Sequence, residues 1–346
     1  MRVVHIAYQQ LRRYGKSRVS WARKLTQGLI KNDHFVEVFS DRDVAAFEAP
    51  FGIRDLGIGK ANKRLLETID AVEPDLVIAG HCDIISNDTL QEIRRRHPEV
   101  VIAHCNNDPL FVPENVERIK HRAAVVDAVF VSTGSRELVI FEGLRARVYH
   151  MPNPVDPSIE NLDNSIRNDL PIDLLFCSNA TAYSKRLESV KWLKEKLDNE
   201  CNFKIYGSFG EPPVWGREYD RVLAQTKMGL NFNRQEGYYW YSSARMAQLA
   251  GNGILQFTHC SNGFDELLPP ESLVYFDEQE DLLDRIREFN ADNAKRQAWA
   301  ARAREFFHAE MNSQLFAQYI VEASLQKTFS HDYVWARDIR PDGRTN

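Results

Sequence analysis

Short apolar runs alternate with amphipathic segments along most of the chain. The runs have the length of buried strands, and the segments between them carry apolar residues at helical spacing, as Trp21, Leu25 and Leu29 do. We expect strands at residues 2–8, 35–40, 76–80, 100–104, 128–133, 147–151, 172–177, 203–206, 228–232, 254–258 and 273–276. We expect helices at residues 21–29, 63–72, 87–96, 116–125, 135–143, 185–197, 219–226, 243–250, 280–290, 293–307 and 314–325. This alternation predicts an α/β fold of doubly wound parallel sheets.

One stretch, residues 151–170, breaks the alternation with three prolines and little apolar periodicity. A chain of 346 residues also exceeds the usual size of a single core. We therefore expect two facing Rossmann-like domains with ligands bound in the cleft between them. The expected division is a first domain at 1–155, a linker at 156–170, a second domain at 171–328 and a tail at 329–346 that packs on the first domain or is loose.

The formal charge of -5 is unevenly distributed. Residues 1–150 hold 22 Lys and Arg against 20 Asp and Glu, and eight basic residues precede the first acidic one, Asp33. Such a segment suits phosphates or an anionic lipid surface, although a solvated helix face is the alternative for each residue. Gly15, Lys16 and Arg18 form a candidate acceptor or phosphate loop within it. Nothing in the sequence predicts a nucleic-acid partner.

The protein is expected to be cytoplasmic, with peripheral membrane contact through the basic segment left open. No apolar run approaches the roughly 20 residues of a membrane span, and the N-terminus does not resemble a signal peptide. The five cysteines are widely spaced and lack a Cys-x-x-Cys pair, so we expect all of them to be reduced.

Two expected helix starts offer anion-binding groups in the second half of the chain. Ser242 and Ser243 are natural N-cap residues before the helix at 243–250, and Arg245 lies in its first turn. Lys185 and Arg186 open the helix at 185–197 in the same way. An ordinary connection with solvated charges is the alternative in both places.

Polar groups also follow two expected strands of the first half. His104 ends one strand and Asp108 comes shortly after it, while His81 ends the preceding strand. A histidine at such an edge can take or give a proton near neutral pH, so these three are candidate catalytic or sugar-orienting residues. A structural role is the alternative for each.

Tyr238 and Trp240 lie in an aromatic run that would stack on a sugar or base, or else pack against protein. No metal or other cofactor is expected. Asp41-Arg42-Asp43 has the spelling of an Asp-x-Asp motif, but it follows an early strand, which favours a structural role.

Several motifs resemble those of GT-B glycosyltransferases, of the group 1 families and the CgeB-like (spore maturation) family in particular. They are G-K-S-R-V-S-W-A-R-K-L near the N-terminus, D-A-V-F-V-S-T followed by Y-H-M-P-N-P-V-D, N-N-D-P-L-F, and R-M-A-Q-L-A-G-N-G-I-L through G-F-D-E-L-L. The resemblance covers roughly residues 1–325. It implies two Rossmann-like domains, a nucleotide-sugar donor in the second domain, and a basic residue at 185 or 186 on the donor phosphate.

Two departures from the family pattern concern the donor. Gln248 stands where the family usually has a glutamate that binds the ribose, and an amide can still donate and accept hydrogen bonds. Glu236 is the only upstream acid of the family's paired-glutamate signature, and the aromatic run separates it from the helix.

The resemblance implies a glycosyltransferase that uses a nucleotide sugar without a metal, on a glycan or lipid-linked acceptor, in cell-surface polysaccharide biosynthesis. A non-catalytic GT-B-like protein that binds nucleotide or glycan is the alternative, motivated by Gln248. A nucleotide-sugar epimerase is a third option. A dehydrogenase is disfavoured because the first strand is followed by Q-Q-L-R-R-Y-G-K-S and not by a Gly-x-Gly-x-x-Gly loop.

Overall fold

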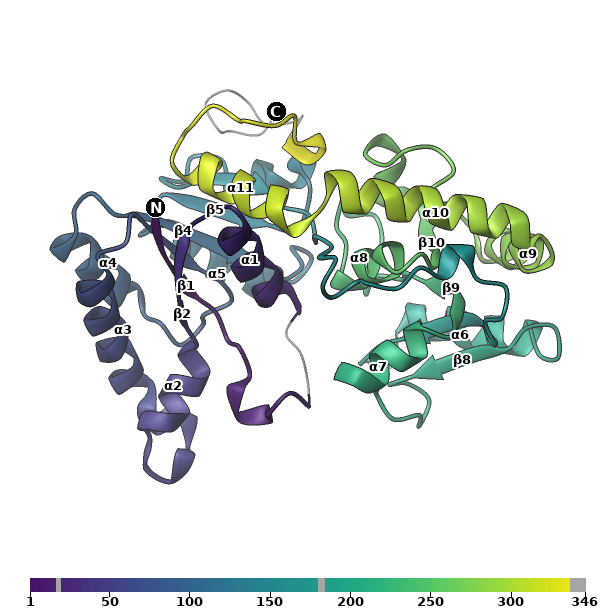
Figure 1. The fold of residues 1–346 in the computed structure, drawn as a ribbon, viewed down its shortest axis with the longest axis horizontal. Helices are drawn as coiled ribbons and strands as arrows, with labels where there is room; N and C mark the ends of the chain where they lie inside the picture. Colours follow the sequence, from purple (N-terminus) through teal and green to yellow (C-terminus); the bar gives the residue numbers. More distant parts are fainter. Residues whose placement is uncertain (17–19, 180–183, 337–346) are drawn as a thin grey trace. The chain divides into compact units, whose positions relative to one another are not determined.

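The computed structural model describes residues 1–16, 20–179 and 184–336 (Figure 1). The chain divides into two compact units: unit 1 is Met1–Pro152 with Ser313–Asn346, and unit 2 is Asn153–Asn312. Each unit holds a parallel sheet flanked by helices. This confirms the predicted pair of Rossmann-like domains. The cleft between them stays a prediction.

Unit 1 contains six parallel strands in the order β2-β1-β3-β4-β5-β6. They are β1 (Arg2–Ile6), β2 (Phe35–Phe39), β3 (Leu76–Ala79), β4 (Val101–Asn106), β5 (Ala128–Val131) and β6 (Arg147–His150). All of β3 is buried, as expected where both faces of a parallel sheet are covered. Ala79 lies opposite both Ile6 and His104, so the register brings the carboxyl ends of β1, β3 and β4 to one edge.

The helices of unit 1 are α1 (Ser20–Lys31), α2 (Asp41–Glu48), α3 (Ile58–Val72), α4 (Asn87–Arg96), α5 (Pro113–Ala123) and α11 (Ser313–Ser324). Short 3₁₀ turns include η1 (Leu11–Arg13), η2 (Pro50–Gly52) and η3 (Arg54–Gly57). The expected helix at 135–143 is a 3₁₀ helix, η4 (Ser135–Phe141). Helix α2 was not expected, because its buried face includes Asp41 and Asp43, which hide the apolar period.

The C-terminal helix α11 belongs to unit 1, whereas the expected second domain continued to residue 328. Its apolar side packs on α1, where the rings of Trp21 and Phe316 lie 6.0 Å apart. The helices approach closely at Gly28, where an added Cβ would lie 1.9 Å from the Ser313 carbonyl oxygen. The following segment packs on the same helix, with Trp335 5.6 Å from Tyr319 between ring centroids.

Unit 2 contains five parallel strands in the order β11-β10-β9-β7-β8. They are β7 (Ile172–Cys177), β8 (Phe203–Tyr206), β9 (Thr226–Leu230), β10 (Leu255–His259) and β11 (Val274–Phe276). The helices are α6 (Lys185–Lys196), α7 (Gly216–Leu223), α8 (Ala244–Gly251), α9 (Gln279–Ala291) and α10 (Asn293–Glu310). Alternate residues of β7 enter two separate cores: Leu174 and Phe176 join one, and Leu175 joins the other.

The expected linker at 156–170 is built into unit 2. Asn164 is fully buried, and its side-chain amide donates to the carbonyl oxygens of Leu223 and Thr226, at 2.8 Å in each case. A turn, η5 (Asn164–Ile166), forms there. The low apolar periodicity of this segment hid its role, because the segment is anchored by side-chain hydrogen bonds and not by an apolar stripe.

Among the described residues, no helix has both the length and the hydropathy needed to cross a membrane. All five cysteines are free thiols.

Candidate functional site

A cavity of about 540 Å³ lies at the carboxyl end of the unit 2 sheet, the edge at which doubly wound sheets bind ligands. Its walls come from the start of α6, the loop after β9, and the ends of β10 and β11. The lining residues are Lys185, Arg186, Ser189, Phe232, Asn233, Arg234, Gln235, Glu236, His259 and Phe276. Three of the predicted donor-binding residues, Lys185, Arg186 and Glu236, therefore lie together.

Arg186 of α6 and Arg245 of α8 meet over one aromatic ring. Their guanidinium carbons lie 5.8 and 5.6 Å from the centroid of Phe176, which β7 supplies. Both also donate from Nη1 to the carbonyl oxygen of Phe232, at 3.5 and 2.9 Å. Within the described part of the chain, neither arginine forms an ion pair with a carboxylate. Two like charges are thus held side by side, and the carboxylate of Glu236 acts on both of them through its charge alone.

Burial acts on both guanidinium groups, and neighbouring positive charges act on that of Arg186. Burial, followed by the neighbouring charge of Arg245, lowers the pKa of Arg186 to about 10, and burial also lowers the pKa of Arg245. Arg186 Nε is buried and has no hydrogen-bond partner among the described residues. Both groups remain cationic at neutral pH, so a bound anion would relieve their repulsion and satisfy Nε. The planar forks suit a phosphate.

Glu236 holds the loop after β9 in place. Its carboxylate accepts from the backbone N–H of Asn233 at 2.8 Å and from Asn262 Nδ2 at 2.7 Å. Asn233 Nδ2 donates to it as well, at 3.2 Å. The cavity wall is therefore fixed by a carboxylate and amide network before any ligand binds.

Unit 1 brings two of the predicted catalytic residues together at the carboxyl ends of β3 and β4. His81 Nδ1 lies 3.7 Å from Asp108 Oδ2. The same carboxylate oxygen accepts from Arg118 Nη2 at 3.0 Å, an interaction that the sequence did not predict. The His81 side chain is 45% exposed, so its other nitrogen is accessible to a substrate. A carboxylate that orients an exposed imidazole is a typical arrangement for a general base.

A family model matches only the second half of the chain. Residues 186–322, which include most of unit 2 and part of α11, are similar to a family described as glycosyl transferase-like. A search among curated proteins found no match.

Solved structures match almost the whole chain. Sucrose-phosphate synthase from Thermosynechococcus elongatus has 12% identity and a TM-score of 0.57, over 94% of this chain and 98% of that one. HepE of Anabaena in complex with UDP-glucose has 13% identity and a TM-score of 0.58, over 94% and 100%. The fold is GT-B. A putative UDP-N-acetylglucosamine 2-epimerase from Listeria monocytogenes is also similar, with 12% identity and a TM-score of 0.53 over 95% and 97%. At such identities the likeness shows the shared fold, and the narrower resemblance to the CgeB-like family stays a prediction.

Gln248, which stands where the family resemblance implies a glutamate, is hydrogen-bonded to a tyrosine. Gln248 Oε1 accepts from the Tyr219 hydroxyl at 3.2 Å, an interaction between α8 and α7 that the sequence did not predict. Ser243 is the N-cap residue of α8, but its hydroxyl caps no backbone N–H and is buried without a partner. The adjacent Ser242 carbonyl oxygen accepts from Asn153 Nδ2 at 2.9 Å. The start of α8 thus keeps a donor group that a ligand could use.

The aromatic run requires a correction. Trp240 is only 4% exposed, its ring is stacked on Tyr239 at 4.7 Å, and its indole N–H donates to the Gly263 carbonyl oxygen at 2.9 Å. The ring is therefore buried against protein, and its N–H bonds to the residue between the turns η6 (Cys260–Asn262) and η7 (Phe264–Glu266), so stacking on a sugar or base was the wrong expectation for this residue. Tyr238 is half-buried and stays a candidate.

His104 also requires a correction. It is 6% exposed, its Nδ1 bonds to the Ala79 carbonyl oxygen at 2.9 Å, and burial, with a contribution from Arg122, lowers its pKa to about 3. A neutral, buried imidazole cannot donate a proton as imidazolium near pH 7. The physical reason is that β4 continues to Asn106, so His104 lies inside a central strand and not at its end.

The candidate loop of the first domain is only partly described. Gly15 has a positive φ of 80° with open space around it, and the backbone N–H of exposed Lys16 donates to the Arg13 carbonyl oxygen at 3.0 Å. Arg18 lies outside the described residues. A role for this loop in binding phosphate or acceptor stays a prediction.

Three side chains of unit 2 lie close enough together to share a metal ion. Within the described residues, His259, Cys260 and Asp277 could offer a metal ligand atom each within 4.8 Å, but the Cys260 thiol donates to Asp277 and His259 Nδ1 bonds to Ser261. The absence of a metal from the reaction stays a prediction.

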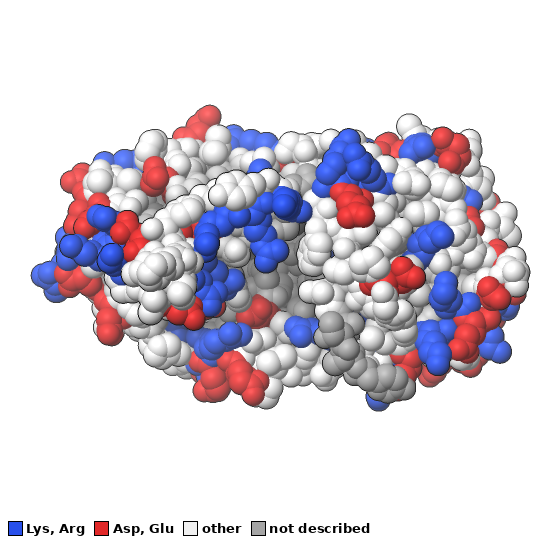
Figure 2. Space-filling model, turned by 90° about the horizontal axis from the view of Figure 1, so that it is seen from below, with Lys and Arg blue, Asp and Glu red and all other residues white. Residues whose placement is uncertain are grey.

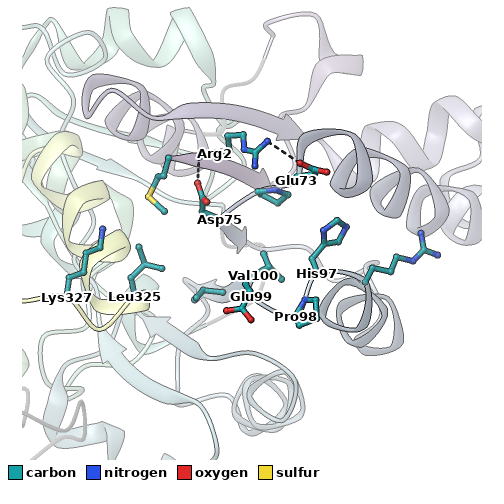
Figure 3. A pocket seen from close by; sticks show the side chains of 13 residues that line it. Arg2, Glu73, Asp75, His97, Pro98, Glu99, Val100, Leu325 and Lys327 are labelled. Atoms are coloured by element: carbon teal, nitrogen blue, oxygen red, sulfur yellow. Dashed lines mark hydrogen bonds and ion pairs between the residues drawn. The ribbon is translucent and has the colours of Figure 1, made fainter.

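A cavity of about 660 Å³ at the amino end of the unit 1 strands has paired charges in its lining (Figure 3). Arg2 forms an ion pair with Glu73 at 3.6 Å, and its backbone N–H donates to Asp75 at 2.7 Å. This end of a parallel sheet lies opposite the ligand-binding edge, and its internal pairing leaves little charge for a ligand.

Proposed function

We propose that the protein is a glycosyltransferase that takes its sugar from a nucleotide-sugar donor bound by unit 2. The single observation that carries this proposal is the pair Arg186 and Arg245, two cations without a carboxylate partner among the described residues, beside the cavity of a glycosyl transferase-like domain. HepE, which shares the fold, has been solved with UDP-glucose, and this supports the choice of donor class.

The chemistry that such a site performs is stabilisation of a leaving phosphate. As the bond from sugar to phosphate breaks, negative charge grows on the leaving oxygen, and fixed cations already in place stabilise it. Arg186 and Arg245 would take this part, with Lys185 at the mouth of the same cavity. In this proposal the guanidinium groups do the work that a metal ion does elsewhere, so transfer proceeds without one. Gln248 and the Ser243 hydroxyl would contact the nucleoside or phosphate.

The acceptor hydroxyl needs a base if the configuration inverts. We assign that role to His81, with Asp108 as its positioning residue, because the carboxylate lies 3.7 Å from Nδ1 and the ring is exposed. A glycan or lipid-linked acceptor of cell-surface polysaccharide synthesis is proposed on the basis of the basic segment before Asp33.

The test is a thermal-shift and turnover panel of UDP-, GDP-, ADP-, TDP- and CMP-sugars on the full chain. Stabilisation by one nucleotide class, lost in Arg186→Gln and kept in Arg287→Gln, is the expected result, because Arg287 lies on an exposed helix face paired with Glu200. No stabilisation by any member would overturn the proposal. Conversion of the donor sugar without any acceptor would identify an epimerase instead.

Gln248→Glu separates an enzyme from a non-catalytic binding protein. If the enzyme uses Gln248 itself to bind the donor, the variant should bind and turn over donor no better than the parent. The substitution replaces an amide that already accepts a hydrogen bond from the Tyr219 hydroxyl with a charged carboxylate. A large gain in turnover would instead indicate a degenerate site in a protein kept for binding alone.

A further inference from the structure

A second cavity at a ligand-binding edge has a strongly basic lining. It measures about 540 Å³ and lies in unit 1, beyond the carboxyl ends of β1 and β2. Its lining is Tyr8, Arg12, Arg13, Arg42, Asp43, Ile53, Arg54 and Asp55, which gives a formal excess of two positive charges. We call it the arginine pocket. Figure 2 shows the distribution of Lys and Arg side chains on the face of the molecule seen from below.

One side of the arginine pocket is held rigidly by Asp43. Its carboxylate accepts from the backbone N–H groups of Leu11 and Arg12, at 2.9 and 3.3 Å. The Ser40 hydroxyl donates to it as well, at 2.6 Å. Asp43 therefore holds the turn η1, which carries Arg12 and Arg13. Its carboxylate oxygens are already hydrogen-bonded to backbone donors.

The other side is ordered by Arg42. This side chain donates to Asp83 Oδ1 from Nε at 3.0 Å and from Nη2 at 2.8 Å, and it lies over the ring of Tyr8, 5.2 Å from the centroid. Arg54 is paired with its neighbour Asp55 at 2.9 Å. Both carboxylates of the lining, Asp43 and Asp55, are thus already occupied.

Two arginines remain without a carboxylate. Arg12 Nη1 donates to the Gly52 carbonyl oxygen at 3.1 Å, and in the described structure the Arg13 side chain forms no hydrogen bond or ion pair. Arginines that are pre-positioned by a hydrogen-bonded turn and lack a counter-charge favour an oxyanion with planar or tetrahedral oxygens. The cavity is also large enough for a monosaccharide unit bearing such a group.

We propose that the arginine pocket binds a phosphate or carboxylate group of the acceptor, so that the protein selects an anionic acceptor. The assignment of the bound group to an acceptor rests on the proposed function, whereas the binding of an oxyanion in this pocket does not. Arg12 and Arg13 supply the forks that contact the oxyanion, Arg42 and Tyr8 form the wall beside it, and Asp43 is the positioning residue for η1.

The experiment titrates three probes into the full chain: glucose 6-phosphate, methyl glucuronide and the neutral methyl glucoside. All titrations use an Arg186→Gln background, so that the donor site contributes less to the signal. Binding of the two anionic sugars but not the neutral one is expected. Arg13→Gln should weaken it roughly tenfold, and Arg12→Gln/Arg13→Gln further, as removal of charge-assisted hydrogen bonds does.

The control is Lys63→Gln/Arg95→Gln, which removes the same charge from exposed helix faces and should leave binding unchanged. Arg13→Gln alone keeps the test valid if loss of the Arg12 contact to Gly52 loosens the fold, and melting curves check this. Sedimentation with phosphatidylglycerol vesicles is the second arm. Vesicle binding that falls in Arg13→Gln while the soluble sugars do not bind would assign the oxyanion to a lipid headgroup.

The proposal would be overturned if neither arginine variant changed the binding of anionic sugars and vesicles. It would also be overturned if the control variant lost as much binding as the arginine variants. The nucleotide-sugar panel on the parent protein is a separate measurement. If that panel fails while the arginine pocket still binds glucose 6-phosphate, the proposed function is wrong and the oxyanion site stands.

Discussion

The guanidinium groups of Arg186 and Arg245 share the ring of Phe176, at 5.8 and 5.6 Å from its centroid. The pair is built from three separate elements, since β7 supplies the ring while α6 and α8 each supply one cation. Stacking on an aromatic face stabilises each cation a little, but it does not cancel the repulsion between them. The arrangement is therefore unfavourable in the free protein and becomes favourable with an anion bound.

Replacing either arginine should separate binding from stability. Arg186→Gln should weaken nucleotide binding roughly tenfold or more, because charge-assisted hydrogen bonds to phosphate are lost. Its melting temperature should be unchanged or higher, since one of two repelling, partly buried charges is gone. Calorimetric titration and thermal melting of the same preparations check this. A matched loss of binding and stability would show that Arg186 is structural.

The pair of His81 and Asp108 predicts a defect in turnover and not in donor binding. His81→Gln should lower kcat on the order of 10²-fold or more, the usual contribution of a general base, while the nucleotide-sugar Kd stays unchanged. Asp108→Asn should have a smaller effect, since it only orients the ring. The control is His97→Gln: His97 also meets a carboxylate, Asp70 at 3.0 Å, but it lines the cavity of Figure 3.

The two aspartates of α2 should respond oppositely to neutralisation. Burial raises the pKa of Asp41 to about 7, Asp83 and Asp43 add to this, and Arg42 opposes it. Because the folded-state pKa is above the unfolded value of 3.8, folding stability falls as pH rises from about 4 to 7 and stays reduced above that range. Asp41→Asn should remove this loss, which the shift limits to roughly 4 kcal/mol. Asp43→Asn should destabilise the protein, because the amide keeps only one of the two oxygens that accept from Leu11, Arg12 and Ser40 and places a donor at the other position.

Urea unfolding at pH 5 and pH 8 measures both variants. The stabilisation by Asp41→Asn should be larger at pH 8 than at pH 5. An equal effect at the two pH values would show that the Asp41 carboxyl group does not titrate across this range.

Local patterns predicted most strands, because a buried parallel strand is an apolar run whatever surrounds it. These patterns gave wrong predictions where packing between distant parts of the chain determines the structure. Helix α2 buries two aspartates, and His104 was placed at a strand end because the polar Asn106 hid the last residues of β4. The sequence also singled out Arg186 and Arg245 separately from their helix starts. No local signal shows that Phe176 brings them together.

The same limit explains the assignment of α11 to unit 1. Its apolar stripe predicts a helix, but no periodicity tells which core that stripe will join. The close approach of α1 and α11 does leave one trace in the sequence, a glycine inside a helix at residue 28, where alanine would otherwise be favoured.

Gly28→Ala tests that packing, with Gly59→Ala as its matched control. Both glycines lie in helices, so alanine gains roughly 1 kcal/mol of helix propensity at each. At Gly59 nothing lies within 4 Å of the added Cβ, and the variant should be more stable by about that amount. At Gly28 the Cβ would meet the Ser313 carbonyl oxygen at 1.9 Å, which forces α11 away from α1 and should destabilise the protein by about 1–3 kcal/mol net. Urea unfolding could instead show the same gain in stability for Gly28→Ala as for Gly59→Ala. In that case α1 and α11 would not be in close contact in solution, and α11 would not pack in unit 1.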